Sequence, residues 1–109
     1  MAALKVETSY AVYENCTLRV AEYQADGSMA VEIFSRQEGP VARLTVCLCD
    51  PTLTKDEAYV DTNNCPWAVA FLEENGLAER TGKMRASGYC IYPAMKFNRE
   101  IMAQFEEES

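Results

Sequence analysis

The residues of this chain with the most distinctive chemistry are its five cysteines, because thiolates are nucleophiles and bind soft metal ions. Cys47 and Cys49 form a C-x-C pair whose side chains fall on the same side of an alternating strand pattern. Together with Cys65 and Cys90 they could supply the four thiolates of a zinc site. That spacing lacks the paired C-x-x-C motifs typical of such sites, so it favours free, buried thiols over a metal centre.

Cys65 precedes Pro66 and Trp67 at an expected helix start, and a thiol at a helix N-terminus can be unusually acidic. A thiol nucleophile needs a general base, but the chain contains no histidine. The chain also lacks a P-loop and a dinucleotide-binding glycine pattern. We therefore predict that the protein is not an enzyme and has no catalytic residue, metal or cofactor, and we interpret Cys65 as part of a structural helix start.

The composition is that of an ordinary globular protein. The 109 residues are 49% hydrophobic and 25% charged, which is enough to bury a core without disulfides or metals. We therefore expect a single domain over residues 1–109. The apolar runs are too short to cross a bilayer. Five cysteines in a chain that shows no export signal favour reduced thiols and a cytoplasmic location.

Charge is distributed unevenly along the chain. The formal net charge is −7, which is unfavourable for general binding to nucleic acid because phosphate contacts supply most non-specific affinity. Residues 80–99, however, hold five of the ten basic residues and no acidic residue. We interpret this stretch as a solvated strand pair that could also hold a phosphate group or an acidic protein surface.

Tyrosine and basic side chains interleave in the same stretch. The chain has six tyrosines, and such amphipathic rings are common at protein interfaces and can also stack on unpaired bases. The alternative is that about half of these rings are buried in the core. We predict a partner-binding surface that also includes an acidic pair from the neighbouring helix. Its members are Lys83, Arg85, Tyr89, Tyr92, Lys96, Glu73 and Glu74.

The first half of the chain alternates in the manner of antiparallel strands joined by short turns. An Asp-Gly pair within residues 25–28 favours a tight hairpin, and residues 37–40 form the next turn. Strands are expected near residues 5–13, 16–23, 29–34 and 41–49. The inward positions are Val6, Thr8, Tyr10 and Val12, then Cys16, Leu18 and Val20, then Met29, Val31 and Ile33, and finally Leu44, Val46 and Leu48.

A loop over residues 50–57 and a short strand over 58–60 lead to the predicted central helix, at about residues 65–75. Trp67, Ala70 and Phe71 share its apolar face, and Trp67 is interpreted as an anchor into the sheet. Gly76 ends the helix in the left-handed conformation. Polar residues before the helix are expected to cap it. The structural motif around it comprises Asp61, Asn63, Asn64, Pro66, Trp67 and Gly76.

The last third contains two expected turns, at residues 81–82 and 87–88. Residues 89–97 are strand-like, and Pro93 predicts an edge strand or an interrupted one because proline cannot donate to a ladder. Asn98 is expected to cap a short C-terminal helix at about 99–107, with Ile101, Met102 and Phe105 as its apolar contacts. The predicted fold class is α+β, an antiparallel β-sheet meander of about five to six strands packed by these two helices.

Two stretches carry a family resemblance, YVDTNNCPWAVAFLEENGLAERTG from residue 59 and SGYCIYPAMKFN from residue 87. They resemble a family of unknown function, short proteins found on conjugative and other mobile elements of gut Firmicutes. The resemblance covers residues 59–98 and does not require cysteine at positions 65 and 90, which weakens the zinc and thiol readings. Its motif is Asp61, Asn63, Asn64, Pro66, Trp67, Gly76, Leu77, Thr81, Gly82, Ser87, Gly88, Tyr92, Pro93 and Phe97.

This resemblance implies a setting rather than a mechanism. Small acidic proteins of mobile elements often block host defence enzymes such as CRISPR or restriction nucleases. The acidic surface of such an inhibitor occupies the basic groove in which the enzyme binds nucleic acid. We therefore hypothesise a non-enzymatic accessory binding protein that acts as an anti-defence inhibitor through protein–protein contact. The alternative is a nucleic-acid-binding accessory factor for transfer or regulation of the element, which would use the basic and aromatic residues of 83–96.

Overall fold

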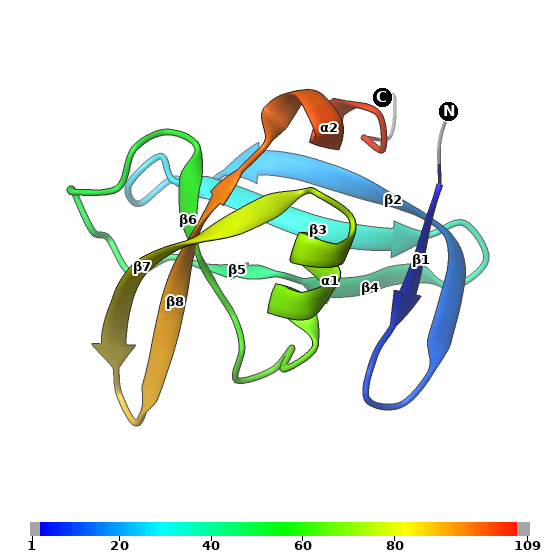
Figure 1. The fold of residues 1–109 in the computed structure, drawn as a ribbon, viewed down its shortest axis with the longest axis horizontal. Coiled ribbons are helices and arrows are strands. Elements are labelled where there is room, and N and C mark those ends of the chain that lie inside the picture. Colours follow the sequence, from blue (N-terminus) through cyan, green and yellow to red (C-terminus); the bar gives the residue numbers. More distant parts are fainter. Residues whose placement is uncertain (1–2, 107–109) are drawn as a thin grey trace.

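Two four-stranded antiparallel sheets contribute to one apolar core in the computed structural model, which describes residues 3–106 (Figure 1). The strand orders are β1-β2-β3-β4 and β5-β6-β8-β7. The elements are β1 (Leu4–Glu7), β2 (Val12–Glu22), β3 (Met29–Ser35), β4 (Gly39–Arg43), β5 (Thr45–Val46), β6 (Glu57–Val60), α1 (Ala68–Glu74), β7 (Ala78–Ser87), β8 (Cys90–Phe97) and α2 (Arg99–Ala103). The α+β class is confirmed, and residues 3–106 form eight strands in two sheets, where a single meander of five to six strands was expected.

The first sheet is a meander, as the alternation of the sequence predicts. Strands β2 and β3 pair in register from Cys16↔Ser35 to Glu22↔Met29, and the Asp-Gly turn joins them. Leu18, Val31 and Ile33 are fully buried on the core face of this pair. Gly27, in the turn, has φ +73°, a conformation that side chains with a Cβ rarely adopt.

The expected first strand over residues 5–13 is instead a hairpin. The Thr8 hydroxyl accepts hydrogen bonds from the backbone N–H groups of Tyr10 and Ala11, at 3.2 and 3.1 Å, and this local turn replaces strand pairing. Tyr10 therefore lies at a turn with 97% of its surface exposed, and Val12 is also exposed. The prediction that both residues face the core is wrong.

The expected strand over residues 41–49 changes sheets at Leu44. The Leu44 N–H donates to the Val31 carbonyl in the first sheet, and the Leu44 carbonyl accepts from Asp61 at the end of β6, both at 2.8 Å. Leu44 is fully buried, while Val46 and Leu48 are only half-buried. One residue thus ends β4 and allows the chain to begin β5.

The second sheet confirms one prediction about its hairpin and corrects another. Strand β8 lies between β6 and β7, but its pairing with β6 extends only from Lys96 to Ala94. At Pro93 the strand is therefore an edge, as predicted, and the missing N–H interrupts no bond on that side. Residues 81–83 form a bulge within β7 rather than a turn, because these three residues lie opposite Ala94 alone. The other expected turn is confirmed, one residue later than predicted, at residues 88–89.

Helix α1 begins later than predicted, at Ala68. Asp61 does not cap it. The Asp61 carboxylate accepts from the backbone and side chain of Asn64, at 3.2 and 2.9 Å, and so closes a turn before the helix. Phe71 and Leu72 are buried, whereas Trp67 is half-buried and meets the Phe71 ring edge-on at 6.0 Å. Ala70, predicted to face inward, is exposed.

The end of α1 follows the prediction closely. Gly76 has φ +68°, the Gly76 N–H bonds to the Glu73 carbonyl at 3.1 Å, and the Leu77 N–H bonds to the Leu72 carbonyl at 2.9 Å. This bonding pattern is the Schellman motif. Leu72 and Leu77 are both fully buried. The hydrogen bond between these two residues therefore fixes both the end of α1 and the start of β7.

Asn98 caps α2, as predicted, by accepting from the Ile101 N–H at 3.1 Å. Met102 is fully buried, and Ile101 and Phe105 pack against the core. The helix ends at Ala103 rather than near 107, because the Phe105 carbonyl accepts a hydrogen bond from the Leu18 N–H at 2.8 Å. The last part of the predicted helix, residue 107, lies outside the described residues. No helix among the described residues is long and apolar enough to cross a membrane.

Substitution of Leu72 tests the packing of α1. Because Leu72 is fully buried, Leu72→Ala is expected to lower the free energy of unfolding by about 2–5 kcal/mol. The exposed Val12→Ala variant should change it by less than about 0.5 kcal/mol. Urea denaturation of the three proteins measures both effects, and equal values for the two variants would contradict this packing.

Candidate functional site

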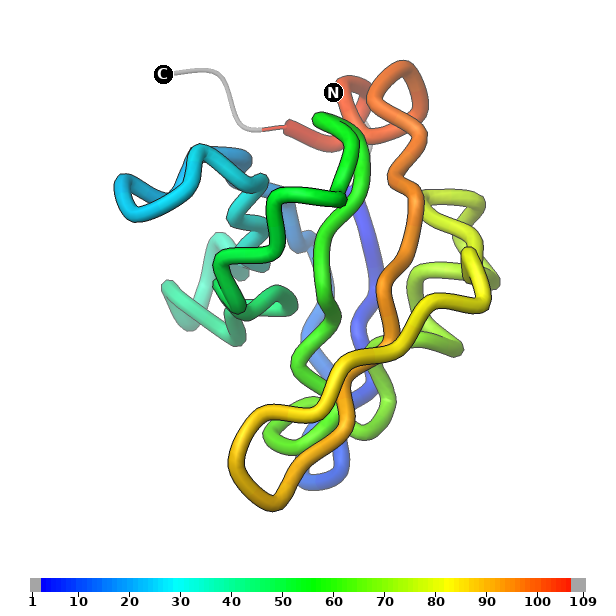
Figure 2. Tube along the Cα trace, turned by 90° about the vertical axis from the view of Figure 1, so that its left-hand side faces the viewer, coloured from blue at the N-terminus to red at the C-terminus, as the bar shows by residue number. Residues whose placement is uncertain are grey.

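The β7–β8 hairpin projects from the end of the second sheet (Figures 1 and 2). Met84 pairs with Pro93 and Ala86 with Ile91, and directly paired residues share one face of an antiparallel sheet. Met84 and Ile91 are 61% and 59% exposed, and Tyr89 at the tip is fully exposed. Nearer the core, the same face of β8 carries the buried Met95 and Phe97. The hairpin therefore extends the apolar face of the sheet beyond the core.

A shallow depression of about 270 Å³ lies beside this face. Its floor is largely apolar, with Met84 and Pro93 from the hairpin and Val69 from α1. Lys83 and Arg80 contribute the charged groups of its lining. The depression is large enough for one apolar side chain of a bound molecule.

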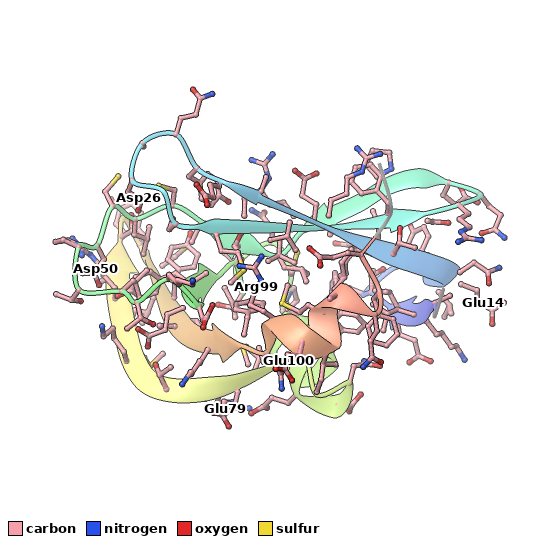
Figure 3. The ribbon with its side chains drawn as sticks, turned by 90° about the horizontal axis from the view of Figure 1, so that it is seen from above. Glu14, Asp26, Asp50, Glu79, Arg99 and Glu100 are labelled. Atoms are coloured by element: carbon pink, nitrogen blue, oxygen red, sulfur yellow. The ribbon has the colours of Figure 1, made fainter. Side chains whose placement is uncertain are left out.

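A larger groove, of about 810 Å³, lies at the base of β7 and beside α2. Its charged lining residues are Asp56, Glu73, Glu79, Glu100, Lys96 and Arg99. Figure 3 shows the side chains of Glu79 and Glu100 near one another beside α2. The ion pair between Arg80 and Glu73, at 3.1 Å, joins the two hollows, since Arg80 lines the depression and Glu73 the groove. Four carboxylates against two cations make the groove acidic.

A hydrogen-bond network centred on Asp50 holds the loop after β5 against the hairpin. The Tyr59 hydroxyl donates to Asp50 Oδ2 at 2.6 Å, and Thr52 donates to Oδ1 from its backbone N–H and its hydroxyl, at 2.9 and 2.7 Å. Arg85 Nη1 lies 3.6 Å from the same oxygen. The bonds from Tyr59 and Thr52 hold the pKa of Asp50 well below its ordinary value. Burial and the bond to Asp50 raise the pKa of Tyr59 to about 12.

This network uses much of the basic charge that the sequence assigned to a binding surface. Arg85 faces Asp50, and Lys83 Nζ donates to the Thr52 hydroxyl at 3.0 Å. Lys96 lies directly across from Glu57 on β6 and from Glu79 on β7 in the strand register. The three cations are therefore spread among acidic and polar partners instead of forming a continuous basic surface.

The other predicted surface residues are dispersed. Tyr89 is at the exposed tip, whereas Tyr92 is half-buried and lies on the face of the hairpin opposite Met84. Glu73 lines the acidic groove. Glu74 lines a separate hollow beside Trp67. The structure thus places Tyr89, Lys83 and Glu73 at the hairpin and the two hollows. It leaves Tyr92 on the opposite face of the hairpin and Glu74 at a separate hollow.

Comparison with known protein families matches residues 17–109 to a family described as Domain of unknown function (DUF4313). The chain belongs to this family. The match begins within β2 and continues through α2, so it extends well beyond residues 59–98, where the resemblance was found in the sequence. Comparison with curated proteins and with solved structures finds no match.

Within this DUF4313 domain, the motif residues around α1 have structural roles. Asp61 and Asn64 close the turn before the helix, and Gly76 ends it. Asn63 and Pro66 are exposed in the same connection. The motif therefore fixes the link between β6, α1 and β7, while the hairpin beyond it carries the exposed apolar surface.

The cysteines do not form the four-thiolate site considered above. Cys65 is buried and its thiol lies 3.7 Å from the Arg43 carbonyl, and Cys90 is in the hairpin. Cys47 and Cys49 do lie together, with their Sγ atoms 3.7 Å apart, but their neighbour is Asp26. Among residues 3–106, the side chains of Asp26, Cys47 and Cys49 are the one group of potential metal ligands that lie close together. Burial, helped by the nearby Asp61 charge, raises the pKa of Cys65 to about 11, which opposes the nucleophile reading.

Sequence reasoning missed the residues that make the surface distinctive. Met84 and Ile91 alternate with polar residues, which is a strand signal, but nothing in the alternation shows that the sheet face continues past the core. Asp50 appeared only as part of a loop, because its partners Tyr59 and Arg85 lie 9 and 35 positions away in the chain.

The Asp50 network predicts a specific dependence on pH. The pKa of Asp50 is depressed from an ordinary value of 3.8, so the stabilisation is complete above about pH 4 and is lost as the pH falls through the depressed pKa. Asp50→Asn should lower the melting temperature at pH 7, and the difference from the unaltered protein should shrink below about pH 4. Thermal melts across pH measure this. The exposed Glu22→Gln serves as the control, and a constant difference at all pH values would contradict the network.

Thiol reactivity should follow burial. With a chelator present, we expect iodoacetamide to label the exposed Cys49 first, and Cys16 and Cys65 only after unfolding, because both are buried and the pKa of each is raised. Mass spectrometry of the native and the urea-unfolded protein identifies the labelled sites. Labelling of native Cys65 as fast as Cys49 would restore Cys65 as a candidate nucleophile.

Proposed function

We propose that this chain is a non-enzymatic binding protein that docks a protein partner on the β7–β8 hairpin. The observation that carries the proposal is the apolar face of the hairpin, with Met84 and Ile91 exposed, Pro93 half-buried between them, and the exposed Tyr89 at the tip. Contiguous exposed apolar surface on a folded domain is characteristic of interaction sites. The adjacent depression offers a place for an apolar anchor of the partner, and such anchors dominate binding energy.

The charges beside the hairpin favour a basic partner. The groove that adjoins the depression carries Asp56, Glu73, Glu79 and Glu100 against two cations, and the chain as a whole has a net charge of −7. Complementary potentials speed association and exclude partners of like charge. The partner we propose therefore combines an apolar contact for the hairpin with a basic surface for the groove.

The finer proposal concerns the identity of this partner. Enzymes that act on nucleic acid present basic grooves, and an acidic protein that occupies such a groove competes with the nucleic acid. Together with the resemblance to proteins of mobile elements, this supports an accessory protein of a mobile genetic element that inhibits a host defence enzyme, of the CRISPR or restriction type, by protein–protein contact.

The alternative, a nucleic-acid-binding accessory factor, receives less support from the site. Such binding depends on cations that neutralise phosphates, and Arg85 and Lys83 already face Asp50 and Thr52. Lys96 lies directly across the sheet from two glutamates. Tyr89 could stack on a base, but its neighbours on the hairpin face are apolar.

The proposal is tested by affinity capture from a lysate of a gut Firmicutes host, divided into nuclease-treated and untreated halves. A protein partner captured on the hairpin should persist after nuclease treatment and fall by at least about tenfold with the double variant Tyr89→Ser/Ile91→Ser. Glu73→Gln/Glu79→Gln should weaken capture chiefly at low salt, because salt screens exposed charges.

A matched control is available in the β1–β2 turn. Tyr10 and Val12 are 97% and 56% exposed, so Tyr10→Ser/Val12→Ser removes comparable surface from another turn and should leave capture unchanged. Equal losses from the two double variants would contradict a site on the hairpin. Capture that disappears with the nucleic acid would favour the accessory-factor alternative.

A further inference from the structure

A second feature of the molecule, away from the apolar face of the hairpin, is the cluster of Asp26, Cys47 and Cys49. Asp26 belongs to the β2–β3 turn, and the two cysteines follow β5. One ligand atom from each residue lies within 4.8 Å of the others. Asp26 and Asp50 lie at the same end of the molecule in Figure 3, so the cluster flanks the loop that the Asp50 network holds.

The spacing of the two thiols suits a tetrahedral metal ion. With zinc–sulfur bonds of about 2.3 Å, two thiolates of a tetrahedral site lie roughly 3.7 Å apart. Cys47 Sγ and Cys49 Sγ are 3.7 Å apart. A disulfide would require about 2.05 Å, so the two thiols already stand at the separation that a bridging ion needs.

The backbone holds these side chains in place. Ser28 donates to Asp26 Oδ1 from its N–H and its hydroxyl, at 2.9 and 2.7 Å, and this fixes the carboxylate toward the loop. Cys49 has φ +53°, which is uncommon for a residue with a side chain and places its thiol beside that of Cys47. Tyr23, just before the turn, donates to the Thr45 carbonyl at 2.9 Å and ties the two segments together.

We propose that Asp26, Cys47 and Cys49 form a binding site for a thiophilic divalent metal ion of the Zn²⁺ class. Two thiolates exclude hard ions such as Mg²⁺, and the carboxylate favours a borderline ion over Cu⁺. Binding releases the protons of both thiols to solvent, since the thiolate is the ligand. Asp26 and Cys49 are exposed, so the fourth coordination position faces water. The ion would join the β2–β3 turn to the loop after β5.

Titration of the reduced, metal-free full chain with Zn²⁺ against a chromophoric chelator tests this site. We expect one equivalent to bind, and Cys49→Ser and Asp26→Asn each to weaken binding at least about tenfold, since even outer-shell changes cost that much. Asn can still accept the Ser28 N–H bond through its amide oxygen, so the turn is retained. Thermal melts of the metal-free variants check that each one folds.

Cys90→Ser is the control, because Cys90 is a half-buried thiol in the β7–β8 hairpin that is not part of the cluster, and the change should not affect binding. Co²⁺ as a second probe should give the intense visible bands and the thiolate charge-transfer absorption of a tetrahedral site. Absence of binding, equal affinity in Cys49→Ser, or a Co²⁺ spectrum without thiolate bands would each overturn the proposal.

Discussion

The change of sheet at Leu44 is the constraint on which the rest of this domain depends. The Leu44 N–H donates to the Val31 carbonyl of the first sheet, and the Leu44 carbonyl accepts from the Asp61 N–H beside the second sheet. One buried segment of backbone therefore belongs to both sheets. Thr45 extends the link, because its hydroxyl accepts from the Val31 N–H at 3.1 Å. Unpaired backbone groups in this interior would be costly. The sheets are therefore held in one arrangement, and the loop after β5 must leave beside the β2–β3 turn.

That exit determines both candidate sites. It sets Cys47 and Cys49 beside Asp26, and it places Asp50 under Tyr59 and Arg85, where the loop supports the face of the hairpin opposite Met84. The hairpin is thus supported on its polar face and left uncovered on its apolar face. Without the loop at Asp50, little would fix the orientation of the projecting hairpin, because α1 reaches only the base of the hairpin.

The sequence predicts those parts of this fold whose causes are local. Alternation places Leu18, Val31 and Ile33 in the core, and the left-handed glycine ends α1 at Gly76, because each depends on neighbours only a few residues away. The turn at Thr8 is also local, but the hydroxyl bonds that form it lie inside a stretch that alternates like a continuous strand. The change of sheet at Leu44 and the bulge at Thr81 depend on partners that the linear pattern does not reveal. For the same reason Lys83 and Arg85 read as a basic surface, although the folded chain gives both of them partners in the loop at Asp50 and Thr52.

The difference between features with local causes and features that depend on distant partners also applies to function. Motif residues such as Asp61 and Gly76 are recognisable in the sequence because their backbone geometry demands particular side chains, and that demand is structural. The binding surface that we propose makes no such demand on the local backbone, so Met84 and Ile91 look like ordinary strand residues until the sheet is assembled. Their exposure costs the isolated domain favourable burial, and contact with a partner would recover it. In a chain of net charge −7, repulsion between like copies opposes self-association on this face, which leaves it available to a partner of opposite charge.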